Sequence, residues 1–335
     1  MNKRIFGTLF FSIFATVTGV GIVVPLLPIY ARDLGAGGLY IGLIFGAFSI
    51  SRSVFLPYFG SLSDRKGRKP FIVIGLFFYV LASLAFMGFD DVESLIVIRF
   101  LQGIASAMIM PVCQAYVGDI TPRGKEGFSM GLFNMSVFIG LSIGPLAGGF
   151  INDRFSLNGA FLAMGVLATV GFLLGLFLLP PTHTERAVRN TESRSGWRRL
   201  LTDIDIMGLF VFRFAYTICI GMIWAFLPVY ADMTFSVTSA EIGLLVMLGV
   251  FTSGLITIPM GALADRFNKL ILVLAGGAVV VYAVYSLCCG HDFWSLFRAN
   301  VLFGLGGGIA MPALMALAVI AGNQTEAMGS VMALL

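Results

Sequence analysis

The stretch GSLSDRKGRKP, residues 60–70, gathers one acid and four bases into eleven residues. Apolar runs lie on both sides of it, at 38–61 and 70–89. Each run is long enough to cross a bilayer, which takes about 20 apolar residues. Because only 11% of the whole chain is charged, this concentration of charge predicts a short loop at a membrane surface.

The composition agrees with that interpretation, since 58% of the 335 residues are hydrophobic, whereas soluble domains are roughly 45–50% apolar. The other candidate spans are residues 5–30, 94–118, 127–152, 157–180, 205–230, 239–264, 269–289 and 295–321, and an eleventh run opens near Glu326. These long, continuous runs favour helices over a β-barrel. The first run is too long for a typical signal peptide and is interpreted as an uncleaved span.

The positions of Lys and Arg predict the orientation of the chain in the membrane. With the N-terminus in the cytoplasm, fifteen of the 21 basic residues fall on the inner side and only Arg32 and Arg154 on the outer side. The remaining four lie within spans. By the positive-inside rule, this asymmetry predicts a cytoplasmic N-terminus. The expected location of this multi-pass chain is the cell's inner membrane.

Three short segments recur after 200 or 201 residues: PIYA at 28–31 as PVYA at 228–231, IGL at 41–43 and 242–244, and GSLSDR at 60–65 as GALADR at 261–266. The sequence therefore predicts an all-α membrane bundle of two six-helix pseudo-repeats. The second repeat is expected to be incomplete, with ten full spans plus a stub. The predicted parts are residues 1–182, a cytoplasmic linker at 183–203, and residues 204–335. Parallel repeats of this kind build one class of secondary transporter.

Four motifs carry a resemblance to a known family. GSLSDRKGRKP fits the pattern G-x-L-x-D-R-x-G-R-[KR] through Gly60, Asp64, Arg65, Gly67 and Arg68. LIVIRFLQGIASA at 95–107 carries Arg99, Gln102 and Gly103. GLFNMSVFIGLSIGPLAGG at 131–149 carries Gly131, Gly140, Gly144, Pro145, Gly148 and Gly149, and GVGIVVPLLP at 19–28 is the fourth motif. In these motifs the chain resembles the major facilitator superfamily, specifically its twelve-span drug:proton antiporter branch.

The loop motif also has a physical interpretation. Gly60 is expected to let the end of its helix approach a neighbour, and Gly67 to adopt a positive φ. Asp64 at a helix end is suited to face the N-terminus of another helix. A contact of that kind that exists in only one transport state is here called a conformational latch. The resemblance implies that this state is outward-facing and that the partner is the eleventh helix; a solvated turn is the alternative. The repeat copy is Gly261, Asp265 and Arg266.

In the fifth predicted span, Gly140, Gly144 and Gly148 are spaced four apart and form one small face. Such a face allows two helices to pack backbone to backbone, and Pro145 adds a kink that neighbouring helices can accommodate. Two interpretations stay open and are compatible. The face provides tight packing, and the same packing seals one side of a transport pathway.

Charged groups inside spans are costly and mark candidate functional sites. The resemblance implies that Arg99, with Gln102 and Gly103, takes part in proton coupling; snorkelling to the surface is the alternative. The candidates for a substrate cavity are Arg52, Gln114, Asn134 and Arg213. All seventeen acids lie in loops or at span ends. A cavity lined by Arg without carboxylates predicts a neutral or anionic substrate.

Other classes of function find little support. The chain has two His residues and no nucleotide loop of the G-x4-G-K-[ST] type. The four cysteines lie in or beside apolar runs, and the cluster of Cys288, Cys289 and His291 lacks a fourth metal ligand. We therefore expect no enzyme, no metal, no cofactor and no nucleic-acid partner.

The favoured function is proton-coupled export of a small organic molecule by alternating access. The expected unit is a monomer in a lipid bilayer, with the proton gradient as its energy source. The alternatives are uptake or exchange of an organic anion, and a non-transporting membrane sensor or scaffold.

Overall fold

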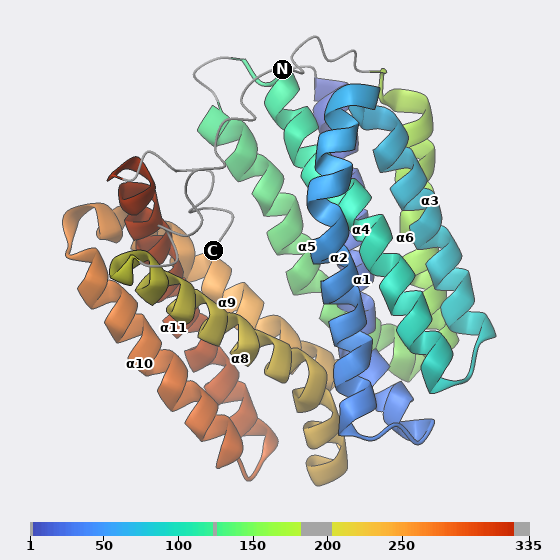
Figure 1. Ribbon diagram of the computed structural model, residues 1–335. Helices are drawn as coiled ribbons and strands as arrows, with labels where there is room; N and C mark the ends of the chain where they lie inside the picture. Colours follow the sequence, from blue (N-terminus) through green and yellow to red (C-terminus); the bar gives the residue numbers. More distant parts are fainter. Residues whose placement is uncertain (1–2, 123–125, 182–202, 325–335) are drawn as a thin grey trace. The chain divides into compact units, whose positions relative to one another are not determined.

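The computed structural model describes residues 3–122, 126–181 and 203–324. Within these residues the chain forms ten α-helices and no strand (Figure 1). The first six are α1 (Lys3–Asp33), α2 (Gly38–Lys66), α3 (Arg68–Gly88), α4 (Val92–Ile120), α5 (Glu126–Arg154) and α6 (Leu157–Leu178). The other four are α8 (Ile204–Phe235), α9 (Ser239–Arg266), α10 (Lys269–Cys288) and α11 (Phe293–Gln324).

All ten described helices are long and apolar enough to cross a membrane. The prediction of an all-α bundle with ten full spans is confirmed, and the eleventh run lies outside the described residues. Most helices run a few residues beyond the predicted apolar stretch. For example, α2 continues to Lys66 and α9 to Arg266. The helix persists there because a long basic side chain can reach water while its backbone hydrogen bonds stay within the helix.

The described residues form two compact units. The first contains 3–122, 126–181 and 225–247, and the second contains 203–224 and 248–324. Helices α8 and α9 therefore each contribute one end to the first unit and the rest to the second. The predicted division into 1–182, 183–203 and 204–335 follows the sequence repeat instead. It stays a prediction, because almost all of the predicted linker lies outside the described residues.

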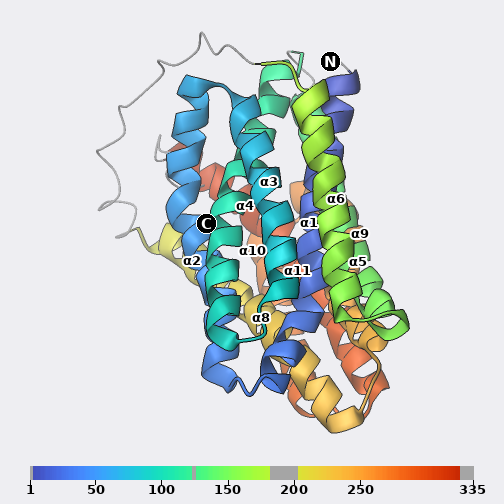
Figure 2. The same ribbon diagram turned by 90° about the vertical axis from the view of Figure 1, so that its right-hand side faces the viewer.

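The first unit is built around α1, which packs along α5 and α6 (Figures 1 and 2). Helix α2 packs along α4, and α3 lies against both α4 and α6. Of the apolar window of α1, 72% is buried, more than in any other described span. The α1 side chains Leu9 and Ile13 are fully buried, as are Ile72 of α3 and Phe133 of α5.

The contact between α5 and α1 depends on glycine. A Cβ atom added to Gly144 would lie 2.7 Å from the carbonyl oxygen of Thr18 and 2.8 Å from the Cα atom of Gly21. A Cβ atom added to Gly148 would lie 2.8 Å from the Cα atom of Ile22. Gly140 faces Thr18 in the same way. The two backbones thus approach more closely than any side chain would permit, which confirms the predicted packing face.

Two glycines of the fifth-span motif lie elsewhere. No described atom comes within 4 Å of a Cβ atom added to Gly131. Gly149 faces the backbone of Ser239 and Ala240, at the start of α9, and not α1. The helix repeat explains the difference, because positions 140, 144 and 148 share one face while 149 is rotated by about 100°.

The second unit repeats a contact of the first. Gly75 of α3 packs against the stretch 105–109 of α4, and Gly276 of α10 packs against the stretch 306–310 of α11. Both pairs are related by 201 residues, the shift between GSLSDR and GALADR. The two hairpins α3–α4 and α10–α11 are therefore packed in the same register.

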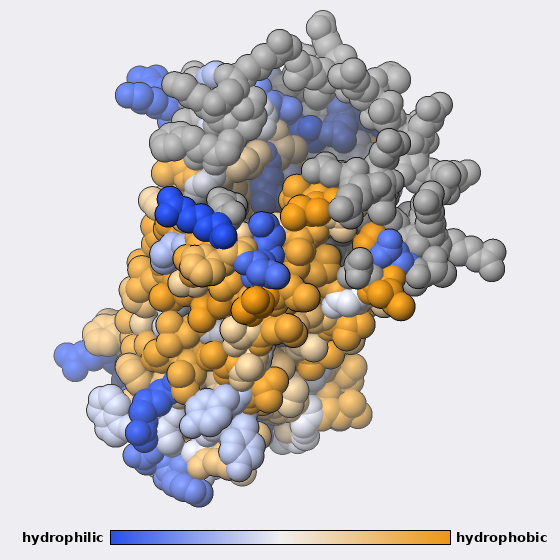
Figure 3. All heavy atoms as spheres, turned by 90° about the vertical axis from the view of Figure 1, so that its left-hand side faces the viewer, coloured by the Kyte–Doolittle hydropathy of each residue, from blue (hydrophilic) through white to orange (hydrophobic). Residues whose placement is uncertain are grey.

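Figure 3 views the chain from the side of α10 and shows apolar side chains over the middle of this face, with polar ones gathered toward its ends. The exposed apolar residues of α10 include Leu270, Ile271, Leu274 and Val281. Exposed apolar patches on soluble monomers rarely exceed a few hundred Å². The apolar surface is therefore suited to contact lipid tails.

The α5–α1 contact yields a stability prediction. We expect Gly148→Val to lower the free energy of unfolding by about 1–3 kcal/mol, because the new side chain overlaps the α1 backbone. Thermal unfolding of the purified protein in detergent measures the change. The matched control is Gly131→Val, a position in the same motif with open space around it. Equal losses of stability in the two variants would contradict the close contact.

Candidate functional site

Arg99 lies in α4 and is buried, with 1% of its surface exposed. Its guanidinium carbon is 4.8 Å from the ring centre of Phe48 and 5.2 Å from that of Phe45, both on α2. Its Nη1 atom donates a hydrogen bond to Oε1 of Gln102 at 2.9 Å. A desolvated cation gains about 2 kcal/mol from an aromatic face. Arg99 is therefore a buried cation held by aromatic rings and a neutral amide, and it does not snorkel to the surface.

Gly103 brings α2 close enough for this arrangement. A Cβ atom added there would overlap the Ser51 hydroxyl and the Phe48 carbonyl group of α2. The Nε2 atom of Gln102 lies 3.8 Å from the sulfur of Met164 on α6. The structure thus brings the three predicted residues of the fourth-span motif into one buried cluster. Sequence reasoning missed Phe45 and Phe48, whose aromatic character alone does not distinguish them from lipid-facing residues.

The loop between α2 and α3 turns at Gly67, which has φ 88° as predicted. Arg68 is almost fully buried there, and it forms ion pairs with Asp64 at 2.5 Å and with Asp119 of α4 at 3.2 Å. Its Nη1 atom also donates to the hydroxyl of Ser63 at 2.7 Å. Arg68 therefore connects the loop to the end of α4. This structural role comes in addition to its contribution to the positive charge of the loop. Sequence reasoning missed Asp119, an acid at the predicted end of its span.

Other residues of the loop motif are exposed. The Asp64 side chain is 51% exposed, and Arg65 is exposed. The expected partner of Asp64 is the eleventh span, the run that opens near Glu326; this run follows the helix labelled α11 and lies outside the described residues. No described atom comes within 4 Å of a Cβ atom added to Gly60, so the expected close approach there stays a prediction. Gly60 lies on a side of α2 that carries no described neighbour at that level.

In the repeat copy, Gly261 likewise has no described neighbour within 4 Å of an added Cβ atom. Arg266 is exposed. The side chain of Asp265 lies outside the described part of the structure. The two helices end at nearly equivalent positions, since α2 ends at Lys66 and α9 at Arg266, and the role of the repeat copy stays a prediction.

The candidates for a substrate cavity occupy different surroundings. Arg52 is half-buried, and its Nη2 atom lies 3.3 Å from the sulfur of Met110. In the second unit, Nη1 of Arg213 lies 3.0 Å from the sulfur of Met311. The two methionines are 201 residues apart, so they are repeat-equivalent. In the described residues no carboxylate forms an ion pair with either arginine. Gln114 of the first unit is half-buried and Asn134 is exposed.

A second group of contacts, not predicted from the sequence, satisfies the N-terminus of α9. The carboxylate of Asp153, at the end of α5, accepts hydrogen bonds from the backbone N–H groups of Ser239 at 3.0 Å and Ala240 at 2.7 Å. Thr238 and Glu241 cap each other, each accepting a bond from the other's backbone N–H. The unpaired N–H groups at a helix start carry partial positive charge. Asp153 therefore binds this end of α9 electrostatically.

An ion pair lies in the same unit. Nη1 of Arg32 in α1 is 2.7 Å from Oδ2 of Asp232 in α8. These residues are repeat-equivalent, since they follow PIYA and PVYA. The sequence shows that these two equivalent positions carry opposite charges.

The α9 contact yields a prediction. We expect Asp153→Asn to speed hydrogen exchange of the Ser239 and Ala240 amides about fivefold, because losing the carboxylate charge costs on the order of 1 kcal/mol at a helix N-terminus. Exchange measured by mass spectrometry on a peptide that begins several residues before Ser239 gives the readout. The control is Glu93→Gln, which removes an exposed acid from the first turn of α4. Unchanged exchange in Asp153→Asn, or the same change in the control, would contradict the contact.

Comparison with known proteins agrees with this architecture. Residues 9–335 match the family model described as Major Facilitator Superfamily. An uncharacterized MFS-type transporter of Methanocaldococcus jannaschii is 28% identical over 323 residues, which are 95% of this chain and 83% of that protein. The quinolone resistance protein NorA of Staphylococcus aureus is 26% identical over 326 residues, covering 94% of this chain and 81% of NorA.

Solved structures share the fold at lower identity. A bacterial homolog of the human lysosomal transporter Spinster is 13% identical, with a TM-score of 0.80, covering 100% of this chain and 80% of that one. The nucleoside transporter NupG is 12% identical, with a TM-score of 0.80, covering 98% and 86%. Because the family model spans nearly the whole chain and the ten described helices have the matching fold, this multi-pass membrane protein belongs to the Major Facilitator Superfamily as a transporter.

Proposed function

We propose that this transporter exports a small organic molecule in exchange for protons, by alternating access. The observation that carries the proposal is the glycine face of α5, whose Gly144 and Gly148 approach the α1 backbone directly. Backbone-to-backbone packing leaves no room for water between the two helices. A path sealed along this contact favours coupled exchange over leak. The relative named a quinolone resistance protein supports an exported organic substrate.

Arg99 is proposed to contribute to proton coupling through its fixed charge. A guanidinium group stays protonated in proteins, so Arg99 itself does not carry the transported proton. Its buried charge, held by Phe45, Phe48 and Gln102, disfavours a second cation nearby. A proton held by substrate or water is therefore released more readily when it comes close to Arg99.

Two acidic residues at opposite ends of the spans are proposed as conformational latches. Asp153, at the end of α5, contacts the N-terminus of α9. Asp64, at the end of α2, is half exposed and pairs with Arg68. Because consecutive spans alternate in direction, the two carboxylates face opposite sides of the membrane. Each would stabilise one transport state by binding a helix N-terminus that the other state withdraws.

The orientation of the chain and the membrane in which it lies are part of the same proposal. Fifteen of the 21 Lys and Arg residues fall on one side when the spans alternate, against two on the other. This distribution supports a cytoplasmic N-terminus in the cell's inner membrane. The loop that carries Asp64 would then face the cytoplasm. The contact between Asp153 and α9 would face the outside of the cell. A monomer is the proposed working unit.

The substrate is proposed to be neutral or anionic. Arg52, Arg99 and Arg213 lie within spans, and none of them is ion-paired with a carboxylate in the described residues. A bound cation at roughly 6 Å from one such charge is disfavoured by about 3 kcal/mol at an effective dielectric constant of about 20. The same arginines favour a second candidate function, the exchange of organic anions. A non-transporting sensor or scaffold is the remaining alternative.

A flux measurement tests the proposed coupling. With the protein in proteoliposomes and a quinolone as the probe, we expect flux that follows an imposed pH gradient and collapses with a protonophore. Arg99→Gln is expected to lower the coupled flux about tenfold or more, on the order of 1.4 kcal/mol in barrier height. The control is Lys3→Gln, which removes an exposed charge at the first residue of α1. Flux that ignores the pH gradient would indicate uncoupled exchange, and no flux of any probe would favour a sensor.

Competition binding tests the charge of the substrate. We expect anionic probes to displace a bound ligand more strongly than cationic probes of matched size, and Arg52→Gln to reduce that preference about tenfold or more, given the few kcal/mol at stake. Arg154→Gln, at the exposed end of α5, is the control for a loss of charge. Tight cation binding that survives Arg52→Gln would overturn the proposal.

A further inference from the structure

The hairpins α3–α4 and α10–α11 can be compared residue by residue, because their register is known. Asp91 accepts a hydrogen bond from the backbone N–H of Ser94 at 2.8 Å, and Asp292 accepts one from Ser295 at 2.9 Å. These caps are 201 residues apart, as are the glycine contacts of the two hairpins. The two hairpins therefore keep the same register from the glycine contact through to the cap of the second helix. Any difference in side chains between the hairpins reflects the sequence and not the backbone.

The outer surface of the first hairpin, near its turn, is apolar. Leu81 and Leu84 of α3, with Val97 and Leu101 of α4, are 41–57% exposed. Lipid tails are the natural contact for such a surface. At this end of α3 and α4, the hairpin presents the side chains expected of a helix pair in hydrocarbon.

The equivalent positions of the second hairpin are different. Tyr282 and Tyr285 replace the two leucines of α3, and Arg298 replaces Val97. Tyr282 and Tyr285 are 61% and 65% exposed, and Arg298 is also exposed. Only Leu302, the equivalent of Leu101, keeps an apolar side chain. The second hairpin therefore presents one cation and two phenols where the first presents hydrocarbon.

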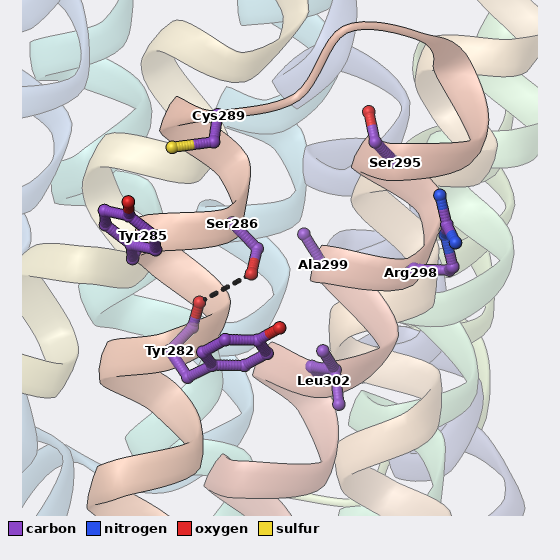
Figure 4. Close-up of a pocket in the computed structure, with 8 residues that line it drawn as sticks. All are labelled: Tyr282, Tyr285, Ser286, Cys289, Ser295, Arg298, Ala299 and Leu302. Atoms are coloured by element: carbon purple, nitrogen blue, oxygen red, sulfur yellow. Dashed lines mark hydrogen bonds between the residues drawn. The ribbon is translucent and has the colours of Figure 1, made fainter.

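These residues surround a pocket of about 390 Å³. Figure 4 shows its lining, which comes from α10, the residue after it and α11. Helix α10 supplies Tyr282, Tyr285 and Ser286, followed by Cys289, and α11 supplies Ser295, Arg298, Ala299 and Leu302. Arg298 is the one charged residue among those that line the pocket. Asp292 does not line it, and its carboxylate accepts the Ser295 N–H.

The depth of Arg298 matches the interface between lipid head groups and hydrocarbon. It lies six residues beyond Asp292 in the turn, or about 9 Å along the helix axis. Its Nε atom donates to the carbonyl oxygen of Trp294 at 3.2 Å. A guanidinium group has five N–H donors, and in the described residues Arg298 has no ion pair with a carboxylate. Tyrosine and tryptophan are the side chains enriched at this depth.

We propose that this pocket binds the phosphate group of an anionic phospholipid. The Arg298 guanidinium offers parallel donors to two phosphate oxygens, a geometry suited to phosphate recognition. Figure 4 shows Tyr282 between Tyr285 and Arg298, so its hydroxyl is the nearer phenol, while the hydroxyl of Tyr285 lies beside Cys289. An anionic head group is preferred to a zwitterionic one, because phosphatidylcholine brings its own cation next to the phosphate. The apolar surface of α10 leaves room for the acyl chains.

The test compares lipid binding by native mass spectrometry of the full chain in detergent. The probes are phosphatidylglycerol and phosphatidylcholine with the same acyl chains. We expect the wild-type chain to retain phosphatidylglycerol preferentially. Arg298→Gln should weaken that binding about fivefold, the effect expected for one basic residue next to an anionic lipid. Lys269→Gln, which removes a basic residue from the opposite end of α10, should leave it unchanged.

Further variants separate the contributions of the tyrosines and of Arg298 to phosphatidylglycerol binding. Exchanging both tyrosines for leucine, the first-hairpin residues, should weaken binding while leaving the Arg298 charge in place. Arg298→Lys should retain part of the preference, because it keeps the charge and loses the paired donors. Glycerol phosphate is the soluble probe. If it competed with phosphatidylglycerol at equal concentration, the pocket would be a site for free phosphate and the lipid proposal would be wrong. Equal phosphatidylglycerol binding by Arg298→Gln and the wild type would also overturn it.

Discussion

In the hydrocarbon core of a bilayer no water is available to pair with a backbone N–H or C=O group, and the rest of this structure depends on that constraint. The ten described helices satisfy their backbones internally, so helix-to-helix contact depends on shape. Small residues permit close contact. Gly144 and Gly148 let α5 pack closely on α1, Gly103 does the same for α4 on α2, and Gly276 for α10 on α11. The buried charge of Arg99 is possible because Gly103 lets the α2 backbone, and with it Phe48, approach α4.

Helix ends are where this architecture uses charge. The start of α9 presents N–H groups with no partners inside the helix, and Asp153 of α5 accepts two of them. Arg68 is bound by Asp64 and Asp119 at the ends of α2 and α4. Such contacts are individually worth little in water. They lie at the ends of the spans, and the role proposed for them is to favour one of two transport states.

The internal repeat shows which positions are structural and which are specialised. Gly75 and Gly276 are identical and make the same contact, and Met110 and Met311 each lie next to an arginine. Elsewhere the copies diverge. Arg99 corresponds to Asn300, whose side chain donates to the Leu296 carbonyl within its own helix. One buried position thus carries a charge in the first repeat and only a local hydrogen bond in the second. Arg32 and Asp232 diverge in sign and pair with each other.

By itself, the sequence determined the number, order and approximate bounds of the described spans, because hydrophobicity and helix length are local properties that the bilayer selects. It also determined the repeat, the positive φ of Gly67 and the glycine face of α5, each of which follows from short-range spacing. Only the tertiary structure decided what the polar residues contact. The aromatic rings around Arg99, the two carboxylates on Arg68 and the carboxylate at the start of α9 come from segments distant along the chain. Their meeting depends on how the helices pack, and periodicity along one helix carries no information about its neighbours.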